Sequence, residues 1–216
     1  MKTIFISLSI CVSSLLNAQF QSTDINIHGG IIRYELNASD SPTFNNGSSS
    51  FGVSIEHYVS DKISLRTGMN YDVKKLLTEF DPKYDHWYLK DKEYLETKSF
   101  VLPFLFNYDF FVRSNNRLSI SSGFTLSKVL KAESTKIYMD GRIITDSEID
   151  NYPDQFYFLQ AGIEYSRYIL DKLYLKISSQ YFFNLTENSR YFLADYNSIF
   201  SYGFSCGLGY KFLVRK

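Results

Sequence analysis

Three histidines are the residues of this 216-residue chain best suited to proton transfer, since imidazole is the side chain that titrates near neutral pH. Histidine catalysis at an acyl group needs a nucleophilic serine and an orienting carboxylate within hydrogen-bond reach. His86 has Asp81 and Asp85 nearby in the sequence but no serine in a fixed relation to it, and His28 and His57 lie in separate segments. The sequence also lacks the spacings His-x-Glu-x-His and Cys-x-x-Cys of metal sites. We therefore predict no enzymatic activity, no metal and no cofactor.

Opposite charges that two predicted hairpins bring together form a second group. Antiparallel pairing across one tight turn sets Glu56 opposite Arg66, and pairing across a later turn sets Glu164 opposite Lys176. Lys211 would lie at a similar level on the last strand. Charges removed from water are costly unless they are paired, so these five residues are predicted to form a structural charge cluster. The alternative is an ion path or a gate.

The clearest element that positions these residues is a strand over residues 199–212. Its even-numbered positions from Phe200 to Phe212 are apolar or aromatic, whereas its odd-numbered positions from Ser201 onward are serine, glycine and Lys211. A period of two over fourteen residues indicates a β-strand and does not fit a helix. The apolar face could cover the core of a soluble sheet or face the lipid around a membrane barrel. The rest of the chain decides between these alternatives.

Seven further segments alternate in the same way, and the connections between the eight are in turn long and short. Strands of this length can cross a bilayer at a tilt, and an even strand number with short turns at one end is typical of an outer-membrane barrel. We therefore predict an all-β fold, an eight-stranded antiparallel up-and-down transmembrane β-barrel. The seven segments are 24–35, 51–59, 63–73, 100–108, 118–127, 156–165 and 173–183, and the long connections are 37–50, 74–97, 131–154 and 185–198.

The beginning of the chain is predicted to be a cleavable signal peptide. Lys2 supplies a positive charge, residues 3–16 are apolar and small, and Ala18 suits the cleavage site. The predicted organisation is a signal peptide at 1–18 and a barrel at 19–216, which makes the protein an exported one of the outer membrane. No run of about eighteen apolar residues follows, so a membrane-spanning helix is not expected.

Composition argues against several other classes of protein. The 23 basic and 23 acidic residues cancel, so charge gives no reason to expect a nucleic-acid partner. Aromatic residues make up 18% of the chain, which suits a protein that needs many amphipathic rings at a boundary between lipid and water. A soluble all-β domain is the alternative, but it has no reason to sort its connections by length.

Two of the long connections carry aromatic and cationic side chains of the kind found in binding surfaces. One contains the run Asp85-His-Trp-Tyr88, and another surrounds Asp140-Gly141, a dipeptide typical of a β-hairpin turn. We predict that they form an extracellular surface that binds a partner, with contact to lipopolysaccharide or to one another as the alternative. The candidate residues are His86, Trp87, Tyr88, Tyr138, Arg142 and Tyr152.

Several strand and turn signatures resemble a known family. The signal ending at Ala18-Gln19 and four later segments, 63–71, 161–165, 171–176 and 207–212, carry the likeness. The chain is similar to the PorT-like outer-membrane β-barrel proteins that are common in Bacteroidetes. This resemblance implies an eight-stranded barrel in a Gram-negative outer membrane, and PorT itself is associated with a secretion and gliding machinery.

The aromatic end of the last strand also resembles the signal that the barrel-assembly machinery reads, although four residues follow Phe212. The assembly machinery is therefore an expected partner during biogenesis, alongside outer-membrane lipid, lipopolysaccharide and a protein of the envelope. The preferred function is a non-enzymatic barrel with a structural, binding or secretion-assembly role through its extracellular loops. A lipid A-modifying enzyme and a small solute channel are the alternatives.

Overall fold

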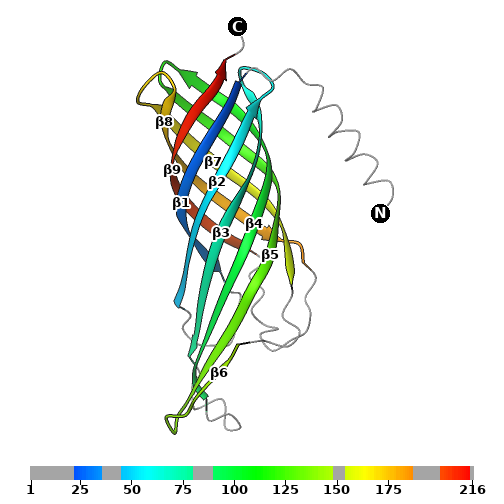
Figure 1. The fold of residues 1–216 in the computed structure, drawn as a ribbon, viewed down its shortest axis with the longest axis vertical. Helices are drawn as coiled ribbons and strands as arrows, with labels where there is room; N and C mark the ends of the chain where they lie inside the picture. Colours follow the sequence, from blue (N-terminus) through cyan, green and yellow to red (C-terminus); the bar gives the residue numbers. More distant parts are fainter. Residues whose placement is uncertain (1–21, 36–44, 80–89, 148–153, 187–199, 215–216) are drawn as a thin grey trace, which may run out of the picture.

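The computed structural model describes residues 22–35, 45–79, 90–147, 154–186 and 200–214 (Figure 1). The predicted signal peptide lies outside these residues. The described chain forms one antiparallel sheet. Its strands are β1 (Ser22–Glu35), β2 (Asn45–Tyr58), β3 (Ile63–Glu79), β4 (Lys90–Arg113), β5 (Asn116–Tyr138), β6 (Ile143–Asp146), β7 (Gln155–Tyr168), β8 (Leu173–Asn184) and β9 (Phe200–Val214). No helix in this part of the chain is long and apolar enough to cross a membrane.

Eight of these strands close into a barrel, as the sequence predicted. Neighbours along the chain pair with one another from β1 to β5 and from β7 to β9, and β5 pairs with β7. The first and last strands, β1 and β9, pair antiparallel over their whole length, from Ser22↔Val214 to Glu35↔Phe200. The sheet therefore has no free edge in the wall, and β6 is an addition to β5 outside it.

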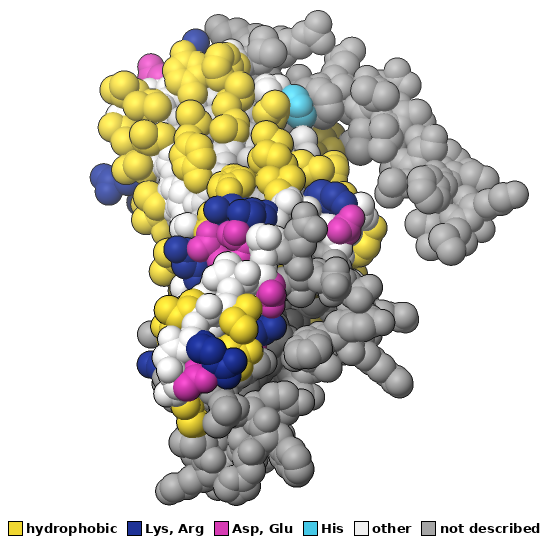
Figure 2. All heavy atoms as spheres, turned by 60° about the horizontal axis from the view of Figure 1, so that its bottom comes forward, with side chains coloured by type: hydrophobic (Ala, Val, Ile, Leu, Met, Phe, Trp, Pro, Cys, Tyr) yellow, Lys and Arg dark blue, Asp and Glu magenta, His cyan; other side chains and the backbone are white. Residues whose placement is uncertain are grey.

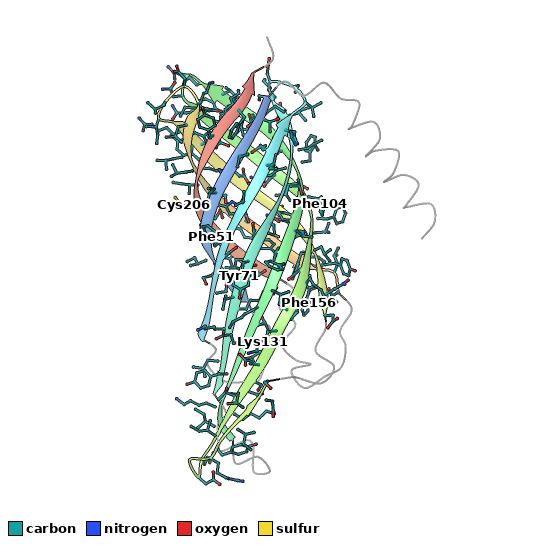
Figure 3. All side chains as sticks on the ribbon, in the orientation of Figure 1. Phe51, Tyr71, Phe104, Lys131, Phe156 and Cys206 are labelled. Carbon is teal, nitrogen blue, oxygen red and sulfur yellow. The ribbon has the colours of Figure 1, made fainter. Side chains whose placement is uncertain are left out.

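Side chains alternate between the lumen and the outer surface along each strand. On β7, Gln160 and Glu164 are buried in the lumen, whereas Tyr157 and Ile163 are exposed. On β9 the predicted faces are confirmed, with Ser201 inside and Phe204 outside. Figure 3 shows aromatic side chains standing outward from the wall, and Figure 2 shows the continuous hydrophobic surface that they form. A surface of this kind is stable in lipid and costly in water, which favours the membrane fold.

The two ends of the barrel differ in the way predicted. At the end that holds the start of β1 and the end of β9, three tight turns join the strands at 59–62, 114–115 and 169–172. In the first of these turns the backbone N–H groups of Val59 and Ser60 both donate to the carbonyl of Ile63. Short turns mark the periplasmic end of outer-membrane barrels, so the opposite end faces the exterior.

Several predicted loops are instead parts of strands. Residues 45–50, 74–79, 90–97 and 131–138 were predicted as loops but continue β2, β3, β4 and β5. The clean apolar alternation stops where the wall leaves the membrane, but the backbone pairing does not, because charged pairs such as Lys75↔Glu96 continue the ladder in water. The predicted hairpin at Asp140-Gly141 is present, with Tyr138 N–H donating to the Arg142 carbonyl and Gly141 at a positive φ of 83°.

Two details of strand pairing correct or refine the sequence prediction. Glu164 lies opposite Ser178, not opposite Lys176, because the turn is centred one position later than predicted. Pro103 lies within β4, and the strand continues on both sides of it. The pairing of β3 with β4 is interrupted at Leu102 and Pro103, as expected where proline has no N–H to donate.

Candidate functional site in the barrel lumen

A layer of buried charges crosses the barrel lumen. Arg66 on β3 donates from Nη1 and Nη2 of its guanidinium group to the carboxylate of Glu164 on β7. Lys176 on β8 donates to Glu56 on β2 at 2.8 Å and lies 3.1 Å from Glu164. Asn107 on β4 adds a hydrogen bond to Glu56 at 2.8 Å. Apart from the contact between Lys176 and Glu164, which lie on the adjacent strands β8 and β7, these contacts link strands that are not neighbours in the sheet. Each of the five residues is at most 9% exposed.

The predicted partners are therefore only partly right. Glu56 and Arg66 are opposite one another in the β2–β3 ladder as predicted, but each forms its ion pair across the lumen instead. Lys211 lies in register with Asp24, which is itself in register with Glu56, so its level is as predicted. Among the described residues it forms no ion pair with the other four. Its ammonium lies 5.8 Å from the centre of the Tyr58 ring.

A second layer fills the lumen on the periplasmic side of the charges. The guanidinium of Arg117 lies 5.0 Å from the ring centre of Tyr58 and 5.5 Å from that of Tyr168, and it pairs with Asp109 at 3.2 Å. Tyr174, only 2% exposed, packs against the Tyr168 ring. This layer was not predicted from the sequence. The signal was available, because all five side chains stand at lumen-facing positions near the short-turn ends of their strands.

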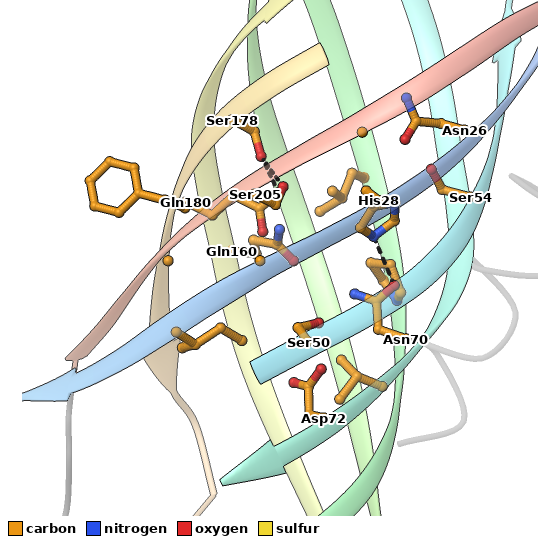
Figure 4. Close-up of a pocket in the computed structure, with 18 of the residues that line it drawn as sticks. Asn26, His28, Ser50, Ser54, Asn70, Asp72, Gln160, Ser178, Gln180 and Ser205 are labelled. Carbon is orange, nitrogen blue, oxygen red and sulfur yellow. Dashed lines mark hydrogen bonds between the residues drawn. The ribbon is translucent and has the colours of Figure 1, made fainter. Parts of the chain in front are cut away.

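A small cavity with a mixed polar and apolar lining lies on the outer side of the charge layer (Figure 4). It has room of about 50 Å³ for water-sized molecules, and it is lined by the charged side chains of Arg66, Lys176 and Asp72 together with uncharged polar and apolar groups. His28 belongs to this cavity, where its Nε2 lies 3.0 Å from Asn70 Oδ1. Further out, the Lys74 ammonium lies over the rings of Phe156 and Phe158 at 5.7 and 5.5 Å. The cavity is thus bounded on both sides by packed side chains.

The remaining predicted residues lie near the ends of the barrel. His57 is on the outward face of β2, and its Nδ1 lies 3.0 Å from the Thr23 hydroxyl. At the tip of the β5–β6 hairpin, the Arg142 guanidinium lies 5.1 Å from the Tyr138 ring centre. The Arg142 backbone N–H and guanidinium both donate to Asp140, which lowers the pKa of that carboxyl. The other predicted loop residues, His86, Trp87, Tyr88 and Tyr152, lie outside the described part of the chain.

The sequence matches the family described as "Outer membrane protein beta-barrel domain" over residues 17–214. The chain belongs to this family. No curated protein matches it in sequence. Among solved structures, this outer-membrane barrel is similar to a major outer membrane protein of Thermus thermophilus, with a TM-score of 0.54. The two sequences are 9% identical, and the match covers 88% of this chain and 99% of the other.

A second similar structure is that of the outer membrane protein OprG of Pseudomonas aeruginosa, with a TM-score of 0.51. The two sequences are 10% identical, and the match covers 90% of this chain and 98% of the OprG chain. Identities this low show the shared fold and nothing about a shared activity. Together the family and the fold place this barrel in the cell outer membrane.

Proposed function

We propose that this protein is a non-enzymatic scaffold of the outer membrane, in which the barrel is an anchor and its extracellular extension binds an envelope or secretion-assembly partner. The observation that carries the proposal is the unequal length of the strands. β4 and β5 contain 24 and 23 residues, whereas β1 and β7 contain 14 each. Because about 9–11 residues suffice to cross the bilayer, β4 and β5 extend far beyond it, together with β6 (Figure 1).

The extension is an ordered surface. Ser134 donates to Glu93 at 2.6 Å between β4 and β5, and Lys136 pairs with Asp146 at 3.0 Å between β5 and β6. Such contacts give the extension a fixed shape outside the membrane. A fixed shape lowers the entropic cost of binding a partner.

Exposed apolar side chains gather at the tip of this extension. Ile143 is 66% exposed, Met139 47% and Ile144 42%, although they lie beyond the part of the wall that lipid covers. Large apolar groups exposed together in water are typical of surfaces that bind another protein. The nearby Tyr138 and Arg142 are residue types enriched at such interfaces.

The filled lumen supports an anchor more than a solute channel. An eight-stranded barrel has an interior just wide enough for side chains. Here the charge layer and the Arg117 layer both occupy it, so a permeant solute would have to displace buried ion pairs.

The other alternative, a lipid A-modifying enzyme, gains little support from the histidines. The partners of His28 and His57 described above are an asparagine and a threonine, and neither arrangement is a serine–histidine–acid triad. Replacing His86, the third histidine, by alanine tests the enzyme alternative further, with lipid A examined by mass spectrometry. We expect unchanged lipid A acylation, and a lost acyl modification in cells that still fold the barrel would favour the enzyme.

The narrower assignment to the PorT-like proteins of Bacteroidetes is also a proposal. It rests on the strand and turn segments 63–71, 161–165, 171–176 and 207–212, which the structure places in β3, β7, the turn into β8 and β9. These segments build the barrel, so a role in secretion has to come from the extension. The proposal therefore assigns that role to β4, β5 and β6.

A photo-crosslinking residue at position 143 tests the scaffold directly. In intact outer membranes we expect a discrete protein adduct from Ile143, and the same residue placed at Phe124, on the lipid face of β5, serves as the matched control. An adduct that is absent at Ile143, or identical at both positions, would contradict a binding role for the extension.

A further inference from the structure

The outward face of β3, β4 and β5 changes from aromatic to charged over successive rows. Tyr71 and Phe100 are opposite one another, and their rings meet edge to face at 5.9 Å. The next outward residue on β4 is Lys98, and the one after it is Glu96. Figure 2 shows basic and acidic side chains gathered where the hydrophobic surface ends. Aromatic rings mark the membrane interface, so this charged row lies at the depth of the lipid headgroups.

Three lysines in this region form a cluster on the outer wall, which we call the lysine cluster. It consists of Lys98 on β4 and of Lys128 and Lys131 on β5. Their side chains are 35%, 44% and 48% exposed. Lys131 stands in direct register with Lys98, and Lys128 is in register with Phe100. Figure 3 shows Lys131 beyond Tyr71 and Phe104 in the direction of the extension.

The pairing of Lys98 with Lys131 is unfavourable in the protein alone. Like charges directly opposite one another on neighbouring strands destabilise a sheet. The next row also pairs like charges, because Glu96 is opposite Glu133. Within β4 and β5 the ion pairs run along each strand, with Lys98 3.2 Å from Glu96 and Lys131 2.6 Å from Glu133. Glu96 also pairs with Lys75 on β3 at 3.3 Å, and Lys128 pairs with Asp154 at 2.8 Å. Lys98 and Lys131 therefore stand side by side in one row, and the glutamate that pairs with each of them lies in the next row of the same strand.

A β-bulge brings the cluster together. Residues 128 and 131 are an odd number of positions apart, so in a regular strand their side chains would face opposite sides. The ladder shifts between Lys98↔Lys131 and Ser99↔Val129, and the extra residue, Leu130, is exposed. This bulge turns Lys131 to the same outer surface as Lys128. Bulges of this kind commonly re-aim side chains at functional positions.

We propose that the lysine cluster binds a phosphate group of the glycolipid in the outer leaflet, the phosphorylated lipid A headgroup. A phosphate between Lys98 and Lys131 would accept charge-assisted hydrogen bonds from both ammonium groups and remove their mutual repulsion. Lys98 and Lys131 lie in the first row beyond the aromatic residues and Lys128 lies beside Phe100, at the depth of a lipid phosphate, whereas Glu96 and Glu133 lie one row further out. There, Glu96 and Glu133 would accept hydrogen bonds from sugar hydroxyls. The site is independent of any partner of the extension.

The test is a titration of the full chain, folded in zwitterionic detergent, with bisphosphorylated lipid A. The midpoint of thermal unfolding is followed by the heat-modifiable mobility of the barrel. The variant K98Q/K131Q removes the two facing charges. The control K62Q/K172Q makes the same change of charge in exposed residues of two periplasmic turns. Dephosphorylated lipid A serves as the control ligand.

Lipid A should raise the unfolding midpoint of the wild type and of K62Q/K172Q. Its affinity for K98Q/K131Q should be lower by at least about tenfold, as the loss of charge-assisted hydrogen bonds to one phosphate would cause. Equal stabilisation of both double variants would overturn the site. Equal stabilisation of the wild type by dephosphorylated lipid A would overturn the recognition of phosphate. No stabilisation of the wild type by lipid A would overturn the proposal as a whole.

Discussion

Arg66 on β3 and Glu164 on β7 are joined across the lumen by a bidentate ion pair, although 98 residues separate them in sequence and their strands are not neighbours. The side chains of Arg66 and Glu164 are 6% and 1% exposed. With Lys176 and Glu56 beside it, this pair braces opposite walls of the barrel. The bracing follows from the small diameter of an eight-stranded barrel, which lets long side chains reach across.

Removing one member of this pair should destabilise the barrel strongly. Replacing Glu164 by alanine leaves the buried Arg66 guanidinium without its main partner, and breaking a buried ion pair in this way costs roughly 3–5 kcal/mol. The measurement is urea unfolding of the barrel in detergent. Asp61→Asn in an exposed periplasmic turn is the control and should change stability little. An equally small loss for Glu164→Ala would contradict the bracing role.

A second prediction concerns a glycine beside Tyr174, in the Arg117 layer. A Cβ at Gly209 on β9 would overlap the ring of Tyr174, whereas a Cβ at Gly29 on β1 would have its nearest neighbour, the Ser50 carbonyl oxygen, at 3.6 Å. Overpacking of this kind costs about 1–3 kcal/mol. Gly209→Ala should therefore lower the unfolding midpoint in urea, and Gly29→Ala should not. Equal effects would mean that Tyr174 is free to move aside.

The direction of insertion can be measured with single cysteines. The native Cys11 and Cys206 are first replaced by serine. Ser147→Cys, just after β6, should then react with a membrane-impermeant maleimide on intact cells, because the extension faces the exterior. Asp61→Cys, in a periplasmic turn, should react only after the outer membrane is permeabilised. The reverse pattern would mean that the barrel is inserted the other way round.

The faces of the strands were predictable from sequence because two physical constraints act together. Lipid outside requires apolar side chains such as Phe204 and Leu208, and a narrow lumen inside requires small ones such as Ser201 and Gly207. The two sets alternate with the pleat. Once the wall leaves the membrane, the lipid constraint ends and only backbone pairing with the neighbouring strands remains. The polar residues 90–97 and 131–138 were therefore predicted as loops, although their backbones stay paired.

The partners inside the lumen could not be predicted from hairpin pairing. Pairing across a turn finds neighbours such as Glu56 and Arg66, but contacts across the lumen depend on the stagger of all eight strands around the barrel. Because the turn at 169–172 is centred one position later than predicted, Lys176 lies opposite Ser166 and not opposite Glu164. The Lys176 ammonium nevertheless lies 3.1 Å from the Glu164 carboxylate, because a lysine side chain is long enough to reach diagonally to the neighbouring strand.

Closure of the barrel predicts a new disulfide bond. Cys206 on β9 is in direct register with Gly29 on β1, and facing positions in a sheet are close enough for a disulfide. With Cys11 replaced by serine, Gly29→Cys should form a bond to Cys206 that changes electrophoretic mobility without reductant. Ile27→Cys, which faces Leu208, is the control and should stay reduced. A disulfide from position 27 and not from position 29 would mean a different register of β1 on β9.

The central claim, that the lumen is a brace and not a pore, is tested most directly by conductance in planar bilayers. The wild-type barrel should insert without producing discrete current steps, because Arg66, Glu164, Lys176 and Glu56 fill the lumen. The result that would contradict the account is a set of discrete steps in the wild type that grow when Glu56 or Lys176 is neutralised.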